Sequence, residues 1–249
     1  AEQLLDFAML RMFRQTLICH GSIDVNRRLS PDVAKSLLAT AFGVYDQAPL
    51  RFDGQPESFQ GSRGANVTTG HPLAKAAMLV MAENWPKRLP FAELETQAHQ
   101  KLAGSSSTAQ EPEVLEQASQ SLAEMLLACA TADIVELHIS PGTFVTELSE
   151  NPIASPLARY QAGIGSTVTT LRHVSLNVDT LSQHLIQLCD GNHGLEAMAS
   201  SVAMLVSEGK FVFQDQGLTT NLPDDVQRLA EQHVQSRLEN LARNALLIG

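Results

Sequence analysis

Residues 71–94, HPLAKAAMLVMAENWPKRLPFAEL, decide the fold, because two helices and the break between them can be recognised in this stretch. His71-Pro72 opens the first helix, since proline suits the first helical position, and Trp85-Pro86 ends it. Its apolar residues recur at helical spacing and are Leu73, Ala76, Ala77, Val80 and Met81. The same spacing predicts a second, shorter helix through Phe91, Leu94 and Ala98.

The sequence that follows completes a winged-helix pattern. After the polar loop GSSSTAQEP (104–112), a third helix is predicted by apolar residues that step by three or four, namely Leu115, Ala118, Leu122, Met125, Leu126 and Cys129. IVELHI (134–139) then predicts a strand. Three helices and a strand are the order of a winged helix-turn-helix unit, which we place at residues 71–140.

Towards the N-terminus the pattern is more mixed. Residues 2–10 carry a helical stripe, FRQTLICHG (13–21) predicts a short strand, and Ser30-Pro31-Asp32 predicts a helix start. Residues 42–70 predict short strands punctuated by glycine and proline. We therefore expect residues 1–70 to form a small mixed α+β segment.

Towards the C-terminus the order of three helices and a strand returns. Helices are predicted at about 181–190, 195–199 and 202–208, followed by a strand at 211–213 and a last amphipathic helix at about 224–247. The predicted fold class is therefore a helix-rich α+β protein, with a mixed N-terminal segment followed by two winged-helix-like units. The two units share an architecture and no obvious residue identity.

Composition limits the partners of the chain. Its 249 residues suggest one or two domains, and its formal net charge of −10 disfavours nucleic acid and anionic membrane surfaces as partners. The three cysteines are widely spaced and odd in number, which favours a reducing, cytoplasmic compartment. The acidic N-terminus is not a signal peptide. Because it begins on a helical pattern without Met, we expect a cut from a longer chain, and removal of Met before Ala is the alternative.

Winged helices often bind DNA, which requires Lys and Arg to neutralise phosphates. Residues 72–140 contain four Lys or Arg against nine Asp or Glu, and residues 166–249 contain five against nine. The expected recognition helices, 90–99 and 194–200, contain no Lys or Arg with which to neutralise phosphates. We therefore expect modules for protein contact or spacing, with an acidic winged-helix transcription regulator as the alternative.

Metal and catalytic motifs are weak. Cys19 adjoins His20, and His184, Cys189 and His193 lie within ten residues, but no established metal-ligand spacing is present. Buried thiols and surface histidines explain these residues, so no metal site is predicted. No G-x-S-x-G motif occurs, and a stand-alone enzyme with an unrecognised site is a third hypothesis.

Two glycine-containing stretches are candidates for a cofactor-binding loop. GIG (163–165) is followed by a β-rich run, and GSRG (61–64) also lacks the order of strand, glycine turn and helix that a methyl-donor loop needs. We expect both to be turns, and we predict no cofactor-binding residues in this chain.

Several segments resemble one family in the family's own order. DFAMLRMFRQTLICH (6–20), HPLAKAAMLVMAENWPKRLPFAEL and LLACATADIVELHISP (126–141) resemble the regulatory domain of bacterial S-adenosylmethionine-dependent methyltransferases. ASPLARYQ, VTTLRHVSL, LIQLCDG and LENLARNALL, all between residues 154 and 247, resemble the C-terminal winged-helix domain of bacterial protein-lysine methyltransferases. The resemblance implies a regulatory domain at 1–150 and a winged-helix-like domain at 151–249.

In that family a class I methyltransferase domain lies N-terminal to this region and holds S-adenosylmethionine. The resemblance implies that this chain is non-catalytic by itself and packs against such a domain. It also implies a scaffold that recognises a protein substrate or forms a homodimer. Catalytic, cofactor-binding and metal residues are accordingly expected to be none in this chain.

Six residues are candidates for interdomain contacts. The motif residues Phe13, Arg14, Gln15 and Thr16 are candidates for contact with the missing domain, and the alternative is that they brace a local turn. Arg172 and His173 follow the strand-like VTTL, where a structural polar contact is the preferred interpretation. The alternative for Arg172 is a bidentate pair with a carboxylate of a partner domain.

Overall fold

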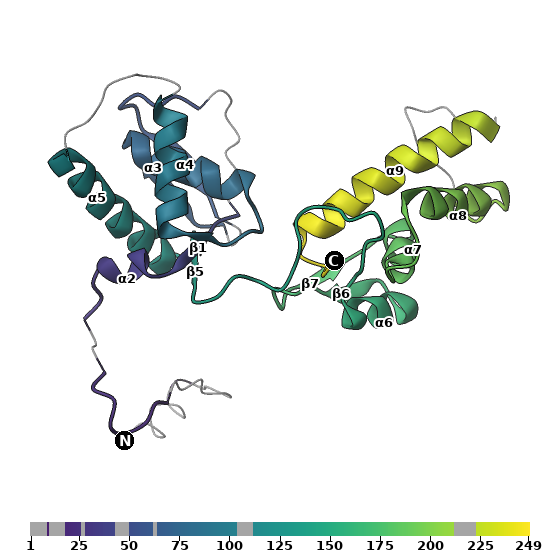
Figure 1. Ribbon diagram of the computed structural model, residues 1–249, viewed down its shortest axis with the longest axis horizontal. Helices are drawn as coiled ribbons and strands as arrows, with labels where there is room; N and C mark the ends of the chain where they lie inside the picture. The colour runs from purple at the N-terminus through teal and green to yellow at the C-terminus, as the bar shows by residue number, and fades with distance from the viewer. Residues whose placement is uncertain are drawn as a thin grey trace. The chain divides into compact units, whose positions relative to one another are not determined.

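The computed structural model describes residues 9, 18–25, 28–42, 50–61, 64–103, 112–211 and 223–249. The chain divides into two compact units, residues 1–30 and residues 31–249, and each is described by itself. Figure 1 shows the ribbon with its helices and strands labelled.

In the first unit the described residues contain a turn. The amide of Ile23 donates to the carbonyl of His20 at 3.0 Å, so the chain reverses over Gly21 and Ser22. Residues 18–21, the described part of the predicted strand 13–21, do not form a strand. Phe13, Arg14, Gln15 and Thr16 lie outside the described residues, as does nearly all of the predicted helix 2–10.

The second unit begins with a three-stranded antiparallel sheet. Its strands are β1 (Leu38–Thr40), β4 (Leu89–Pro90) and β5 (Glu136–His138). β1 lies in the centre, with Leu38 opposite both Pro90 and His138. A separate hairpin precedes α3, and it consists of β2 (Glu57–Gln60) and β3 (Asn66–Thr69).

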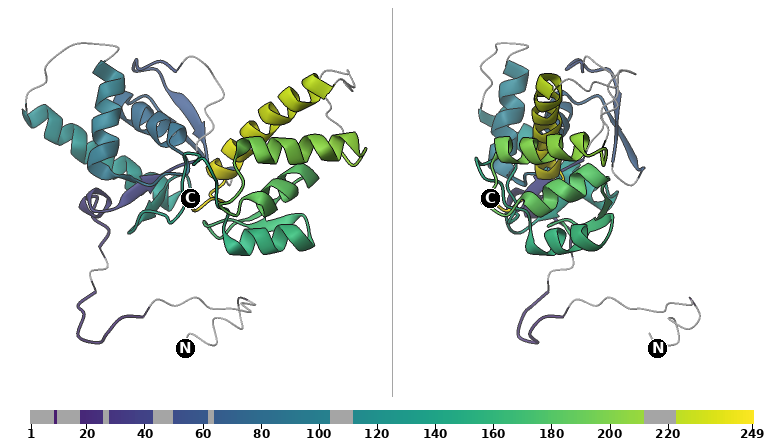
Figure 2. Two further views of the ribbon diagram at one scale, coloured as in Figure 1. Left: turned by 45° about the vertical axis from the view of Figure 1, so that its right-hand side comes forward. Right: turned by 90° about the vertical axis from the view of Figure 1, so that its right-hand side faces the viewer.

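Four helices pack with this sheet. They are α2 (Asp32–Lys35), α3 (Pro72–Glu83), α4 (Phe91–Ala103) and α5 (Pro112–Thr131). The predicted stripe of α3 is buried throughout, and α3 packs closely on α4, as the views of Figures 1 and 2 agree. The buried apolar side chains of this part of the chain, from Ala34 to Val135, form one cluster, which we name the first core.

A second cluster of buried apolar side chains runs from Ala154 to Leu247, and we name it the second core. Its elements are α6 (Pro156–Ile164), β6 (Thr167–Thr169), β7 (Ser175–Asn177), α7 (Thr180–Leu188), α8 (Leu195–Ser207) and α9 (Pro223–Arg243). β6 and β7 form an antiparallel hairpin, and α8 packs along α9 in both Figures 1 and 2.

The helix-rich α+β class is confirmed, and so are the helices predicted from residues 71 to 129. α3 ends at Glu83, just before the predicted Trp85-Pro86 break, and that peptide bond is cis. β5 is shorter than the predicted strand 134–139, because Ile134 and Val135 are buried ahead of it without strand pairing. The predicted boundary between domains at residue 150 stays a prediction.

Three details of the C-terminal prediction are wrong. The helices predicted at 195–199 and 202–208 are one helix, α8, because no breaking residue lies between Ala199 and Val202. GIG (163–165) is not a turn but the end of α6, where Gly165 caps the helix, so helix precedes strand in the reverse of a cofactor loop. The last helix ends at Arg243 and not at 247, since Ala245 takes a left-handed φ of 53°.

α6 itself was missed by the sequence reasoning. Its start carries the same signal as residues 30–32, with Ser155 as cap and Pro156 at the first position. The Ser155 hydroxyl accepts from the amide of Ala158 at 3.1 Å. The predicted strand 211–213 is described only at Phe211, which is not in a strand.

Candidate functional site

The strongest cluster of charged and aromatic side chains is centred on Arg172, at the tip of the β6–β7 hairpin. The tip has three residues, 171–173, and His173 completes it with a left-handed φ of 59°. Histidine is one of the residue types enriched in that region. The amide of His173 donates to the carbonyl of Thr170 at 2.9 Å, which closes the turn.

Three further hydrogen bonds fix the tip. The Thr170 hydroxyl accepts from the amides of Arg172 and Val174, each at 3.3 Å. The amide of Leu171 donates to the carbonyl of Ala245 at 2.8 Å, which ties the hairpin to the segment after α9. The backbone of Arg172 is therefore held by the second core, while its side chain points away from the hairpin.

Trp85 belongs to the turn between α3 and β4. Asn84 caps α3, and the amide of Lys87 donates to the carbonyl of Asn84 at 2.8 Å across the cis proline. The Trp85 ring meets the Phe42 ring edge-on, with 5.2 Å between the ring centroids. Because Phe42 lies just after β1 in the chain, this contact holds Trp85 beside β1.

Arg172 contacts both Trp85 and Glu136. Its guanidinium lies 4.0 Å from the centroid of the Trp85 ring, within the range of a cation–π contact. Its Nη2 donates to Oε2 of Glu136, the first residue of β5. The Arg172 side chain is only 7% exposed, and its Nη1 is buried without a hydrogen-bond partner.

Two more basic groups surround the same carboxylate. His138 Nε2 lies 3.1 Å from Oε2 of Glu136, the oxygen that also accepts from Arg172. Arg88 donates to the carbonyl of Ser140 at 3.0 Å, and its guanidinium lies 5.8 Å from the centroid of the Phe144 ring. Arg172 and His138 therefore share one carboxylate oxygen, and the charge of Arg88 also interacts with Glu136. We name Trp85, Arg88, Glu136, His138 and Arg172 the Arg172 cluster.

Burial and neighbouring positive charges lower the pKa of two groups in the cluster. Burial lowers the pKa of Arg88, the charge of Arg172 lowers it further, and Glu136 partly offsets both. Burial likewise lowers the pKa of His138, with Arg88 and Arg172 acting in the same direction and Glu136 against them. In both groups Glu136 favours the charged form, against burial and the neighbouring cations.

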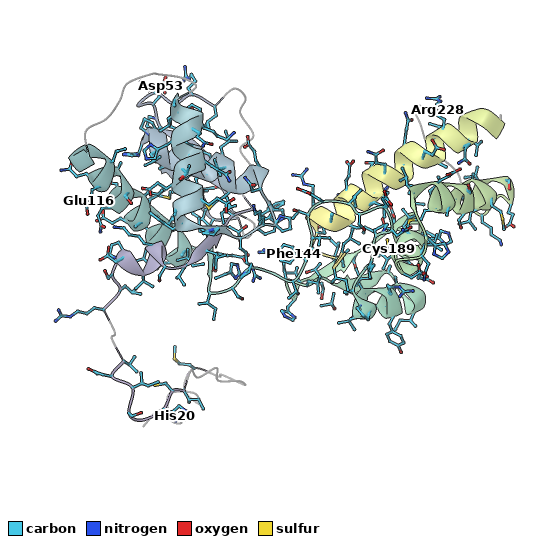
Figure 3. The ribbon with its side chains drawn as sticks, in the orientation of Figure 1. His20, Asp53, Glu116, Phe144, Cys189 and Arg228 are labelled. Carbon is cyan, nitrogen blue, oxygen red and sulfur yellow. The ribbon has the colours of Figure 1, made fainter. Side chains whose placement is uncertain are left out.

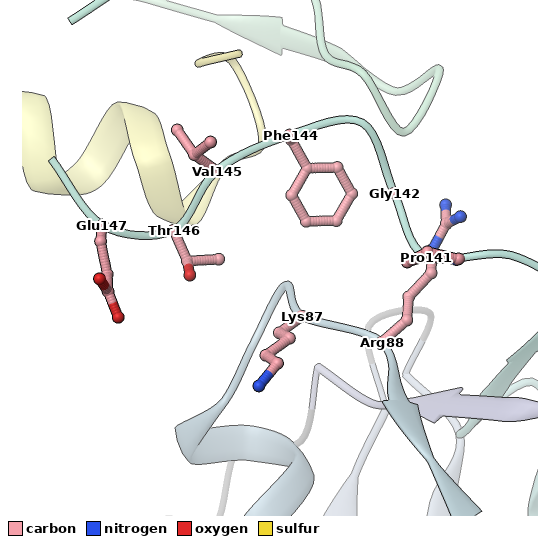
Figure 4. Close-up of a pocket in the computed structure, with 8 residues that line it drawn as sticks. All are labelled: Lys87, Arg88, Pro141, Gly142, Phe144, Val145, Thr146 and Glu147. Carbon is pink, nitrogen blue, oxygen red and sulfur yellow. The ribbon is translucent and has the colours of Figure 1, made fainter. Parts of the chain in front are cut away.

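A pocket of about 380 Å³ adjoins Arg88, and Figure 4 shows the side chains around it. It is lined by Lys87, Arg88, Pro141, Gly142, Phe144, Val145, Thr146 and Glu147. Gly142 is required there, because a Cβ at this position would overlap the Phe144 ring. The lining offers two cations, one carboxylate and one hydroxyl, which suits polar contact more than nucleophilic chemistry.

Lys75 is a buried charge that the sequence reasoning missed, since it was counted there among the surface bases. Its side chain is 0% exposed, and its Nζ donates to the carbonyls of Arg51 at 2.7 Å and Asp53 at 3.0 Å. The carboxylates of Asp53 and Glu57 lie 3.7 and 3.8 Å away. Lys75 thus fastens the segment before β2 to α3, and no sequence signal distinguishes it from a surface lysine.

The histidines and cysteines weighed as metal ligands have separate partners. His184 Nε2 lies 2.9 Å from the Ser201 hydroxyl, and His193 Nδ1 lies 2.9 Å from Oδ1 of Asp190. Cys189 lies where α7 ends, as Figure 3 shows. It is buried, and burial raises its pKa to about 12. Among the described residues, no group of three His, Cys, Asp or Glu side chains is placed to hold a metal ion.

The helices weighed for DNA recognition are poor in basic residues. α8 carries no Lys or Arg over Leu195–Ser207, and α4 carries only Lys101, which pairs with Glu83 at 2.7 Å. Neither helix offers the unpaired cations that phosphate contact requires. In the described part of the chain, no helix is long and apolar enough to cross a membrane.

The structure places the candidate contact residues differently. Arg172 meets a carboxylate and an aromatic ring of this same chain, whereas His173 is exposed at the hairpin tip. Phe13, Arg14, Gln15 and Thr16 lie outside the described residues, so their contacts stay a prediction. Trp85 and Glu136 were not singled out from the sequence, because nothing in their local context marks the distant arginine that they meet.

Comparison with known proteins connects this structure to one family. Residues 150–246 match the family model of the PKMT C-terminal winged helix domain. The whole chain also aligns with the structure of PKMT2 from Rickettsia typhi, with a TM-score of 0.80 and 20% identity, and covers 50% of that chain. The structure of the same protein in complex with AdoHcy aligns with a TM-score of 0.78 and 21% identity and is covered to 49%.

Two curated relatives come from Rickettsia prowazekii. Uncharacterized protein RP789 is 23% identical over 256 residues, an alignment that covers 99% of this chain and 44% of the relative. Uncharacterized protein RP027 is 21% identical over 268 residues, which cover 98% of this chain and 100% of the relative. The chain therefore spans about half the length of PKMT2 and RP789 and the whole length of RP027. The resemblance read from the sequence motifs is confirmed.

Proposed function

We propose a function for the whole chain from the match of residues 150–246 to the family model of the PKMT C-terminal winged helix domain. The chain is the non-catalytic scaffold of an S-adenosylmethionine-dependent protein-lysine methyltransferase. It packs against a class I catalytic domain and presents a surface to a protein substrate. The observation that carries the proposal is the alignment of the whole chain with one half of PKMT2.

The chemistry of the described residues supports a scaffold. The pocket beside Arg88 has no thiol or imidazole in its lining, and GIG (163–165) ends a helix instead of opening one. The methyl donor would therefore bind in the catalytic domain of a longer protein. The match over the whole length of RP027 supports the same division, because that relative consists of this region alone.

The electrostatics favour a protein partner over DNA. The formal net charge is −10, and the helices weighed for DNA recognition are nearly free of cations. A protein surface can be matched by both signs of charge, whereas a phosphate backbone demands clustered Lys and Arg. The acidic transcription regulator is therefore disfavoured.

Calorimetric titration of the 249-residue chain with S-adenosylmethionine tests the proposal. No binding at micromolar concentration is expected, and no methyl transfer to protein substrates by this chain alone. Micromolar binding together with turnover would overturn the proposal. A mobility-shift assay at low salt tests the transcription regulator, for which binding must weaken steeply as salt rises.

A further inference from the structure

The two hydrophobic cores of residues 31–249 are largely independent of one another. Among the described helices and strands, every pair that packs extensively lies within one core. The first core draws on β1, α3, α4 and α5, and the second on α6 to α9. Bodies with separate cores and few shared contacts move relative to one another unless specific contacts prevent it.

Arg172 supplies such a contact from the second core to the first. Its backbone is fixed by Thr170, and its guanidinium both stacks on Trp85 and pairs with Glu136. The two partners come from different elements of the first core, the turn after α3 and strand β5. A planar guanidinium can stack and form an ion pair at the same time, which lysine cannot do equally well.

From this geometry we propose that Arg172, Trp85 and Glu136 form a latch that holds the two cores in one arrangement and can be released. Arg172, Trp85 and Glu136 lie outside both clusters of buried apolar side chains, so opening the latch leaves both cores folded. Arg172 keeps an unpartnered buried Nη1 when the latch is closed, which weakens the closed state relative to a fully bonded arginine. The proposal concerns this chain alone and stands without the proposed methyltransferase role.

The sequence provides a built-in reporter of the latch. Trp85 is the only tryptophan among the 249 residues, so the emission of the chain comes from the ring that Arg172 covers. Replacing Arg172 by alanine is expected to shift this emission to the red, because water then reaches the ring. The matched control is Arg237→Ala, which removes an arginine of α9 whose partly exposed ion pair with Asp179, at 2.8 Å, joins two elements of the second core.

Spin labels measure the distance between the cores directly. Glu124→Cys on α5 and Gln235→Cys on α9 place labels at exposed positions, in a Cys19→Ser background. Cys129 and Cys189 are buried and burial raises the pKa of both thiols, which keeps them from the label. The otherwise native chain and Arg237→Ala are expected to give one narrow distance distribution, and Arg172→Ala a broad one.

Unchanged emission and an unchanged distribution in Arg172→Ala would overturn the latch. Should that variant lose helical circular dichroism, Glu136→Gln and Arg172→Lys decide, since both preserve the size of the side chain. Broadening in both then supports the latch, and a native distribution in both rejects it.

Discussion

The two cores bury different kinds of polar side chain. The first core encloses the ammonium of Lys75 and the hydroxyl of Thr40, both 0% exposed. The buried polar residues of the second core are Ser155, Thr170 and Ser182, and each lies at a helix start or a tight turn. One core is thus fastened by a charge and the other by hydrogen bonds at the ends of its elements.

This difference determines how each core should respond to substitution. Removal of a buried charge leaves several neighbouring groups without their partner at once. Removal of a capping hydroxyl breaks only one or two neutral hydrogen bonds. The first core should therefore contain the most sensitive position in the chain. The second core should instead contain several positions of moderate sensitivity.

The largest effect is expected from Lys75→Met, which tests the charge that fastens the first core. Methionine fills a similar volume, but the carboxylates of Asp53 and Glu57 lose a buried cation, and two carbonyls lose their donor. We expect the free energy of unfolding to fall by about 4 kcal/mol, as when one partner of a buried ion pair is removed. Urea denaturation followed by circular dichroism measures the change.

Lys101→Met is the matched control for Lys75→Met. Its ion pair with Glu83 is partly exposed on both sides, and such pairs contribute at most about 1 kcal/mol. Equal losses in the two variants would show that Lys75 acts as an ordinary surface lysine.

Lys75 also marks the limit of what the sequence revealed about the first core. The helices at residues 72–131 followed from apolar spacing, because a period of 3.6 residues is a local property. The burial of Lys75 depends on carbonyls 22 and 24 positions away along the chain, and no local pattern encodes that contact. The neighbouring residues on α3 do not indicate that Lys75 is buried, since that helix is buried on almost every side.

The start of the second core was harder to predict, because α6 has only nine residues and its main signal is its cap. Ser155-Pro156 carried the same start signal as residues 30–32, but α6 buries only Ala158 and Ala162 and exposes its larger apolar side chains, so its apolar residues do not mark one buried face. Arg172 was a candidate contact residue from the sequence, and its role between domains stays a prediction, whereas Trp85 and Glu136 could not be matched to it. Pairing across 36 positions between β5 and a hairpin tip is a property of tertiary structure alone.

The second prediction sets the two buried threonines against each other. Thr40 Oγ1 has no hydrogen-bond partner, whereas Thr170 Oγ1 accepts from two amides. Valine has nearly the same shape, so Thr40→Val should raise the free energy of unfolding by about 1 kcal/mol, by relieving a buried unsatisfied hydroxyl. Thr170→Val should lower it by about 1 kcal/mol.

Chemical denaturation of the two valine variants under identical conditions measures both signs. The comparison between the cores fails if the two substitutions change stability in the same direction. Emission of Trp85 in the Thr170→Val variant also shows whether the hairpin tip still holds Arg172 in place.

The third prediction concerns the cap of α6. Ser155→Ala removes the hydroxyl that accepts from the amide of Ala158, and loss of such a cap costs about 1 kcal/mol. Ser207→Ala is the control, because its exposed hydroxyl donates only to the carbonyl of Met204 at the end of α8. Hydrogen exchange should speed up in α6 for the first variant, and equal exchange in the two variants would contradict the assignment of Ser155.

The smallest effect is expected from pH, through His184 in the second core. Burial lowers the pKa of His184 below its ordinary value, so the unfolded chain takes up the proton first as the pH falls. Stability is therefore complete above the unfolded pKa of about 6.5 and declines as the pH falls below it. His184→Gln should remove part of this decline between pH 7.5 and 5.5, measured as the free energy of unfolding at both values.

Ser201→Ala keeps the imidazole while removing the hydroxyl 2.9 Å away, so it should keep the decline. A decline in His184→Gln as steep as in the native chain would assign the acid sensitivity to other groups, of which His138 in the Arg172 cluster is the next to test, since burial lowers its pKa as well.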